Sequence, residues 1–163
     1  MVVKNVHERV LQSPFAAAGE LIDKLASRDD LLWPRERWPA MKLDRPLGVG
    51  ARGGHGPIRY VVEAYKPGRS VRFRFIAPRG FVGTHELDLA EVAPGASRLR
   101  HVLEMRVEGL ARVSWPLAFR WLHDALIEDA LDRAAALGQT TTGGRRNWSR
   151  PVRVLRWAVN YLR

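Results

Sequence analysis

Two histidines on neighbouring predicted strands are the residues of this sequence best placed for chemistry. His85 lies in THELDL and His101 in SRLRHVLEM, and the Pro94-Gly95 turn between them predicts antiparallel pairing of the two strands. Each histidine has the parity of the apolar residues on its own strand, so both are expected on an apolar face. Because imidazole titrates near neutral pH, the pair could orient a polar group of a ligand or transfer a proton. The alternative is that each is a hydrogen-bonded core histidine with a structural role.

Tyr60, in the predicted strand IRYVVEAY, is the third residue that could act as a general acid or base. The spacing of these three residues does not by itself require catalysis. A nucleophilic triad can be assembled from Ser114, His123 and Asp124, but adjacent helix positions point apart and the GxSxG turn is absent. We therefore reject a serine nucleophile.

The sequence predicts no metal site and no cofactor. Zinc requires three or four converging ligands, and neither HxH nor HExxH occurs. His101 and Glu104 have opposite parity on one strand, so their side chains are expected to point apart.

A glycine-rich segment between Gly48 and Gly56 resembles a phosphate loop only superficially. It lacks the GxxxxGK pattern and leads into a strand, so these glycines are interpreted as permitting a sharp turn. Arg52, His55 and Arg59 could still lie together at a cavity mouth and bind a carboxylate or phosphate.

The elements that would position these residues form a meander of antiparallel strands. From Gly53 to Leu103, short period-two segments alternate with Pro-Gly turns. The turn at Pro67-Gly68 predicts that two apolar sets face each other across the first hairpin. One set is Ile58, Tyr60, Val62 and Ala64, and the other is Val71, Phe73 and Phe75.

Further elements flank the meander on both sides. A strand over Val3–Leu11 and a helix capped by Ser13, from Pro14 to Leu25, precede it. The two Trp-Pro pairs of LLWPRERWPAM predict an irregular flap with buried tryptophans. A long helix from Trp115-Pro116 to Leu137 follows, and its apolar stripe is expected to grip the sheet. The stripe contains Phe119, Leu122, Leu126, Ala130 and Leu137, whereas Leu117, Ile127 and Leu131 are expected on the outer surface beside a charged row. This order predicts an α+β fold in which a curved antiparallel sheet and the long helix enclose an apolar cavity.

The net charge of +10 is concentrated in the C-terminal segment. Residues 139–163 contain six arginines and no acid, and the rest of the chain has 21 basic against 17 acidic residues, or +4. We expect two parts: a domain over residues 1–137, then a flexible linker and a basic amphipathic helix over 138–163. Cysteine is absent, and we find neither a secretion signal nor a membrane span, so a cytoplasmic location is expected.

Val152, Leu155, Val159 and Leu162 form the apolar side of this C-terminal helix, with arginines beside them. Three interpretations remain open. The helix could dock on its own domain or on a second copy, self-association then using residues 148–163. It could bind an anionic membrane surface, which would place the protein peripherally at the membrane. It could bind nucleic acid, although the interleaved aromatic residues of such surfaces are missing.

The order of elements, with HGPIRYVVEAYKPGRSVRFRF, PRGFVGTHELDL and WPLAFRWLHDALIEDALDRA, resembles the SRPBCC superfamily, also called START-like or Bet v 1-like. It most resembles small bacterial members described as polyketide cyclase/dehydrase-like, over residues 1–137. The resemblance implies a helix-grip fold whose pocket, between sheet and terminal helix, serves lipids, sterols, polyketides and hormones. In some members it also implies cyclisation or dehydration.

Three hypotheses of function result. The first is a binding module without assigned chemistry, holding a hydrophobic small molecule or lipid in the cavity. Its expected ligand-binding residues are Tyr60, Val62, Phe73, Phe75, His85, Leu87, His101, Leu103, Leu122 and Leu126. The second is a cyclase or dehydratase with His101, His85 and Tyr60 as acid–base groups. The third is a peripheral membrane or partner-binding protein acting through its C-terminal helix.

Overall fold

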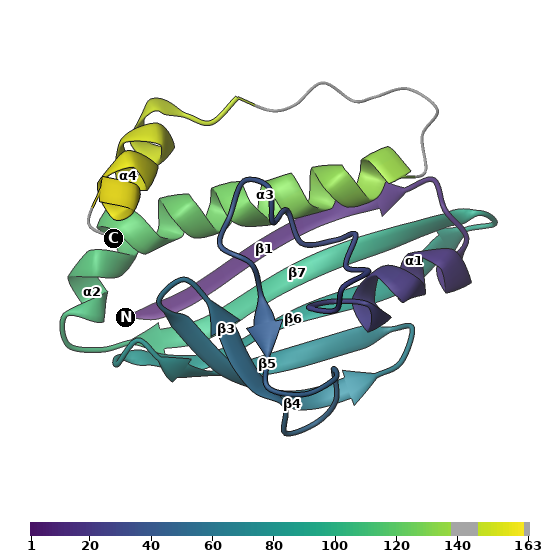
Figure 1. Cartoon of the computed structure of the whole chain (residues 1–163), viewed down its shortest axis with the longest axis horizontal. Helices are drawn as coiled ribbons and strands as arrows, with labels where there is room; N and C mark the ends of the chain where they lie inside the picture. The colour runs from purple at the N-terminus through teal and green to yellow at the C-terminus, as the bar shows by residue number, and fades with distance from the viewer. Residues whose placement is uncertain (138–146, 162–163) are drawn as a thin grey trace.

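The computed structural model describes the backbone of residues 1–137 and 147–161, and side chains as far as Trp157. A seven-stranded antiparallel sheet of order β1-β7-β6-β5-β4-β3-β2 curves beneath the long helix α3, which runs alongside β1 (Figure 1). The strands are β1 (Val2–Leu11), β2 (Lys42–Leu43), β3 (Arg52–His55), β4 (Ile58–Lys66), β5 (Ser70–Ala77), β6 (Phe81–Ala93) and β7 (Ala96–Val107). The helices are α1 (Phe15–Asp23), α2 (Ala111–Ser114), a π-helical turn (Trp115–Phe119), α3 (Arg120–Leu137) and α4 (Arg150–Tyr161). This is the predicted helix-grip architecture.

The β6–β7 hairpin has the predicted parity. His85 pairs with Leu103 and Leu87 pairs with His101, so both histidines lie on the apolar inner face with Leu99, which is fully buried. Alternation along the two strands is therefore enough to direct both imidazoles inward.

The β4–β5 hairpin departs from the prediction at one residue. Tyr60 pairs with Phe75 and Val62 with Phe73 as expected, but the register shifts between Val62 and Ala64. The extra residue of this β-bulge reverses the parity beyond it, so Ala64 is exposed. The expectation that Ala64 shares the apolar face was therefore wrong.

Helix α1 begins at Phe15, with Pro14 as its N-terminal cap residue. No side-chain hydrogen bond caps it, so the predicted capping role of Ser13 was wrong. The helix packs closely against the β4–β5 turn. Asp23 accepts hydrogen bonds from the Gly68 amide at 2.7 Å and the Tyr65 hydroxyl at 2.8 Å.

The C-terminal helical segment begins at Ala111, earlier than predicted, and its orientation differs from the sequence expectation. Leu126 and Ala130 are buried as expected, but Ile127 and Leu131, predicted on the outer surface, are buried as well. Leu137, predicted in the gripping stripe, is 52 % exposed.

Polar residues of β1 explain this difference. Asn5, His7 and Arg9 occupy alternate positions on β1 and contact the acidic row of α3. Asp124, Glu128 and Asp132 therefore face a strand, and Ile127 and Leu131 cannot lie on the surface beside them.

The flap and α4 lie against α3. Trp33 and Trp38 are buried, as predicted for the flap of residues 31–41. Val152 of α4 is only 4 % exposed, and the indoles of Trp148 and Trp38 both donate to Asp129 of α3. The predicted linker, and the side chains of Val159 and Leu162, fall outside the described residues. Within the described part of the chain, no helix is both long and apolar enough to cross a membrane.

Candidate functional site

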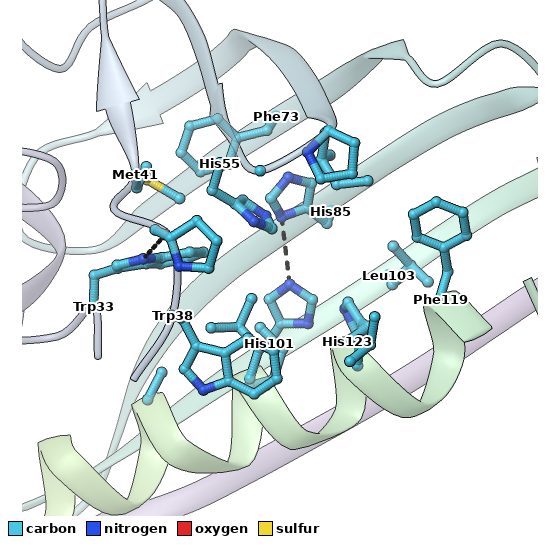
Figure 2. Close-up of a pocket in the computed structure, with 18 of the residues that line it drawn as sticks. Trp33, Trp38, Met41, His55, Phe73, His85, His101, Leu103, Phe119 and His123 are labelled. Atoms are coloured by element: carbon cyan, nitrogen blue, oxygen red, sulfur yellow. Dashed lines mark hydrogen bonds between the residues drawn. The ribbon is translucent and has the colours of Figure 1, made fainter. Parts of the chain in front are cut away.

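The described residues surround a cavity of about 500 Å³ between α3, the inner faces of β5, β6 and β7, and the flap (Figure 2). Its walls are mainly aromatic and aliphatic. Eight of the ten residues expected to bind a ligand line it: Phe73, Phe75, His85, Leu87, His101, Leu103, Leu122 and Leu126. Tyr60 and Val62 are instead buried in the packed wall, where the Tyr60 ring lies 4.8 Å from that of Phe73.

Further lining residues were not identified as ligand-binding from the sequence. They include Trp33, Trp38, Phe81, Trp115, Phe119 and His123. For His123 a signal existed, because residues 119, 123, 126 and 130 share one helical face. For the flap tryptophans the placement depends on long-range packing, which no local pattern reveals.

The site brings all five histidines of the chain into one connected row. Ring centroids are separated by 5.5 Å between His85 and His101, by 5.1 Å between His101 and His123, and by 6.1 Å between His123 and His7. His55 joins the row through Tyr60, whose ring lies 6.1 Å from His55 and 5.2 Å from His85. Figure 2 shows His101 between His85 of the sheet and His123 of α3. The row leads from the cavity to the β1–α3 interface.

Aromatic and polar contacts fix the inner end of the row. The His85 ring stacks on Phe73 at 4.9 Å and on Phe75 at 5.1 Å. Nδ1 of His85 lies 3.4 Å from Nε2 of His101, a long hydrogen bond.

Carboxylates of α3 hold His7 and His123, the histidines of the row that lie nearest the β1–α3 interface. His7 lies 2.7 Å from Oε1 of Glu128 and 3.3 Å from Oδ1 of Asp124, to which Asn5 also donates at 3.0 Å. Nδ1 of His123 lies 3.2 Å from the same Asp124 oxygen. The argument that His123 and Asp124 must point apart was therefore wrong, because the two side chains bend toward each other.

Burial divides the histidines electrostatically. It lowers the pKa of His85 and His101 well below the ordinary value, lowers that of His55 to about 3, and lowers that of His123 against the opposing hydrogen bond from Asp124. The hydrogen bond with Asp124 raises the pKa of His7, although burial opposes it. The four histidines that line the cavity therefore favour the neutral form. Of the five histidines, His7 at the β1–α3 interface is the one whose charged form is favoured.

Some polar atoms of the site have no partner among the described residues. Nδ1 of His101, Nε2 of His123 and the Tyr60 hydroxyl are buried without a hydrogen bond. An unsatisfied buried polar group is costly. His101 and His123 line the cavity, so their nitrogens are candidate contacts for a polar group of a ligand, whereas Tyr60 lies outside the lining.

Three potential metal ligands also meet here. Ligand atoms of His7, His123 and Asp124 lie within 4.8 Å of one another. Asn5 already donates to Asp124, and His7 already binds Glu128. The expectation that the protein has no metal site stays a prediction.

The cavity mouth differs from the one expected. His55 lines the cavity, whereas Arg52 and Arg59 are exposed and lie outside the lining. Arg35, Arg37 and Arg156 contribute the basic groups instead.

Comparison with known proteins identifies the fold alone. Neither protein families nor curated proteins match the sequence. Among solved structures, a conserved protein of unknown function from Enterococcus faecalis has a TM-score of 0.63 at 15 % identity, over 99 % of this chain and 87 % of its own. CalU16 from Micromonospora echinospora has a TM-score of 0.61 at 14 % identity, over 98 % and 87 %. Norcoclaurine synthase from Thalictrum flavum, in complex with dopamine and hydroxybenzaldehyde, has a TM-score of 0.63 at 12 % identity, over 86 % and 90 %. The chain thus has a helix-grip fold of the Bet v 1-like kind.

Proposed function

We propose that this protein binds a small organic molecule or lipid with an apolar body in its cavity, and that His85 and His101 hydrogen-bond to the polar group of that ligand. The observation that carries the proposal is a cavity of about 500 Å³ with largely apolar walls. Ligand pockets are typically about 300–1,000 Å³ and combine apolar walls with a few polar groups. The proposal includes membership of the SRPBCC superfamily, which the helix-grip fold supports.

Two further observations support binding. The unpartnered atoms of His101 and His123 would gain hydrogen bonds from a ligand. Norcoclaurine synthase, which has a similar fold, has been solved with two small aromatic molecules bound.

Uptake of the neutral fluorescent probe phenylnaphthylamine tests the proposal. Ala118 lines the cavity, so Ala118→Trp should fill it and weaken probe binding by about tenfold or more. The matched control is Leu117→Trp, because the neighbouring Leu117 is 69 % exposed and points away from the core. Equal probe binding by wild type and Ala118→Trp would contradict the cavity assignment. Independently of the probe, native mass spectrometry followed by organic extraction would identify any ligand that the protein retains from the cell.

The histidine row favours a second candidate function, acid–base catalysis on a β-dicarbonyl compound of the polyketide kind. In this reaction the neutral imidazole of His101 or His85 accepts the proton of the activated carbon, the C–H electrons form an enolate, and the imidazolium returns the proton. The contact between these two imidazoles at 3.4 Å and the adjoining His123 provide neighbouring proton acceptors.

Deuterium exchange into a linear β-diketone, followed by NMR, tests this candidate. His101→Asn should abolish the protein-catalysed exchange, whereas His55→Asn should retain it, because His55 lines the cavity but lies outside the His85–His101 contact. Exchange at the uncatalysed rate with wild type would leave binding as the function that the cavity supports.

A further inference from the structure

The mouth of the cavity contains an arginine that forms no ion pair with a carboxylate of the described residues. Arg156 of α4 lines the cavity, and its guanidinium lies 4.4 Å from the Trp38 ring and 4.1 Å from the Trp148 ring. Arg37 of the flap stacks on the same Trp148 ring at 3.9 Å. Two guanidinium groups and two indoles therefore form one cluster where α4 meets the flap.

The carboxylate beside this cluster, that of Asp129, already accepts hydrogen bonds from other groups. Asp129 accepts from Arg37 through Oδ1 at 2.7 Å, and from Trp38 and Trp148 through Oδ2 at 2.7 and 3.0 Å. Among the described residues Arg156 makes no ion pair with a carboxylate, and its recorded partners are the two indole rings. Asp129 is not among the residues that line the cavity, and the carboxylate that does line it, that of Glu36, binds Arg133 at 2.6 Å. The mouth thus has an excess of positive charge.

Arg156 is available to a ligand. Among the described residues its guanidinium contacts two indole rings and no hydrogen-bond acceptor, so its N–H donors can bind the two oxygens of an acidic group. Burial and the nearby charge of Arg37 lower the pKa of Arg156, which means that the charged guanidinium is destabilised at this position. A bound anion would offset that destabilisation. Deeper in the cavity, His55, His85 and His101 are neutral, which leaves the mouth as the place for a charged group.

We propose that the ligand is an amphipathic organic anion, whose carboxylate, sulfonate or phosphate binds Arg156 at the mouth while its apolar body occupies the cavity. This rests on the proposed binding function and narrows its ligand class. In this arrangement α4 completes the binding site by adding a cation to the apolar cavity of the helix-grip domain.

A pair of probes with one skeleton tests the charge preference. Anilinonaphthalene sulfonate is phenylnaphthylamine with an added sulfonate, so the ratio of their dissociation constants isolates the contribution of the anion. Arg156→Gln should weaken sulfonate binding by about tenfold, the size of one charge-assisted hydrogen bond, while the neutral probe changes by less than about twofold. Arg156→Lys, which keeps the charge, should retain most of the preference.

Arg153→Gln is the matched control, because it removes the same charge from an exposed position of the same helix. It should leave both dissociation constants unchanged, and thermal unfolding should show that all variants are folded. An unchanged sulfonate affinity in Arg156→Gln, or an equal loss for both probes, would overturn the anion subsite. Neutral-probe binding by wild type would even then uphold the cavity, whereas failure of wild type to bind either probe would contradict the proposed function itself.

Discussion

His101 is a buried histidine whose ionisation should control the acid stability of the protein. It is 2 % exposed, and burial holds its pKa well below the unfolded value of 6.5. Below pH 6.5 the unfolded chain therefore binds a proton that the folded chain does not, and stability falls as the pH falls. His55, His85 and His123 act in the same direction, whereas His7, whose pKa is raised, contributes stability that is lost as the pH rises through that value.

Replacing His101 should therefore flatten the acid side of the stability profile. In urea unfolding between pH 7 and pH 5, His101→Gln should reduce the slope of the unfolding free energy by up to about 1.4 kcal/mol per pH unit, the value for one proton. Any loss of packing shifts the whole curve without changing its slope. An unchanged slope would mean that His101 has the same pKa in the folded and unfolded protein, which would contradict its lowered pKa.

Asp129 is the acceptor that connects α3, the flap and the segment before α4. It is 7 % exposed and accepts from Arg37, Trp38 and Trp148. Asp129→Ala should lower the free energy of unfolding by about 2–4 kcal/mol, because a buried indole N–H and a guanidinium lose their partner. Asp129→Asn should cost less, since it keeps one oxygen acceptor. Glu91→Ala, at an exposed site, is the control, and equal unfolding midpoints for it and Asp129→Ala would refute the bridging role.

Among the elements, the contact between α1 and the β4–β5 turn depends on a residue without a side chain. A Cβ at Gly19 would lie 2.5 Å from the Gly68 carbonyl oxygen and 2.8 Å from its Cα. Gly19→Ala should therefore destabilise the protein by about 1–3 kcal/mol, as overpacking does. Helix propensity alone predicts the opposite, a gain of about 1 kcal/mol. Ala17→Gly, on the exposed side of α1, measures that propensity, and a stabilised Gly19→Ala would disprove the close approach.

Local periodicity predicts the elements well and their mutual rotation poorly. The parity of His85 and His101 follows from alternation along one hairpin, and the inward placement of both side chains was predicted correctly. Alternation cannot anticipate the bulge before Ala64, since it depends on how two strands pair. The rotation of α3 depends on the match between Asn5, His7 and Arg9 and an acidic row more than a hundred residues away. His123 lies on the helical face of Phe119 and Leu126, so its place in the lining could be read from the sequence, whereas its contact with Asp124 and His7 could not.

For the whole molecule, the contact between α4 and the helix-grip domain decides whether α4 is available to other partners. The cavity is formed mostly by residues 25–131, and α4 contributes Arg156. The inner face of α4 buries Val152, whereas Val154 on the same helix is 63 % exposed. A membrane surface or a second copy that used Val152 would have to displace α4 from its own domain.

Val152→Asp tests whether α4 is an independent part of the molecule. Burying a carboxylate is far costlier than undocking one terminal helix, so this change should release α4 while the domain stays folded. Hydrogen exchange should then increase in residues 150–157 and remain slow in β5, β6 and β7. Val154→Asp introduces the same charge on the exposed side and should leave exchange in α4 slow. Cooperative unfolding of the sheet in Val152→Asp would instead show that α4 is an integral part of the core, and the division of the chain after residue 137 would have to be abandoned.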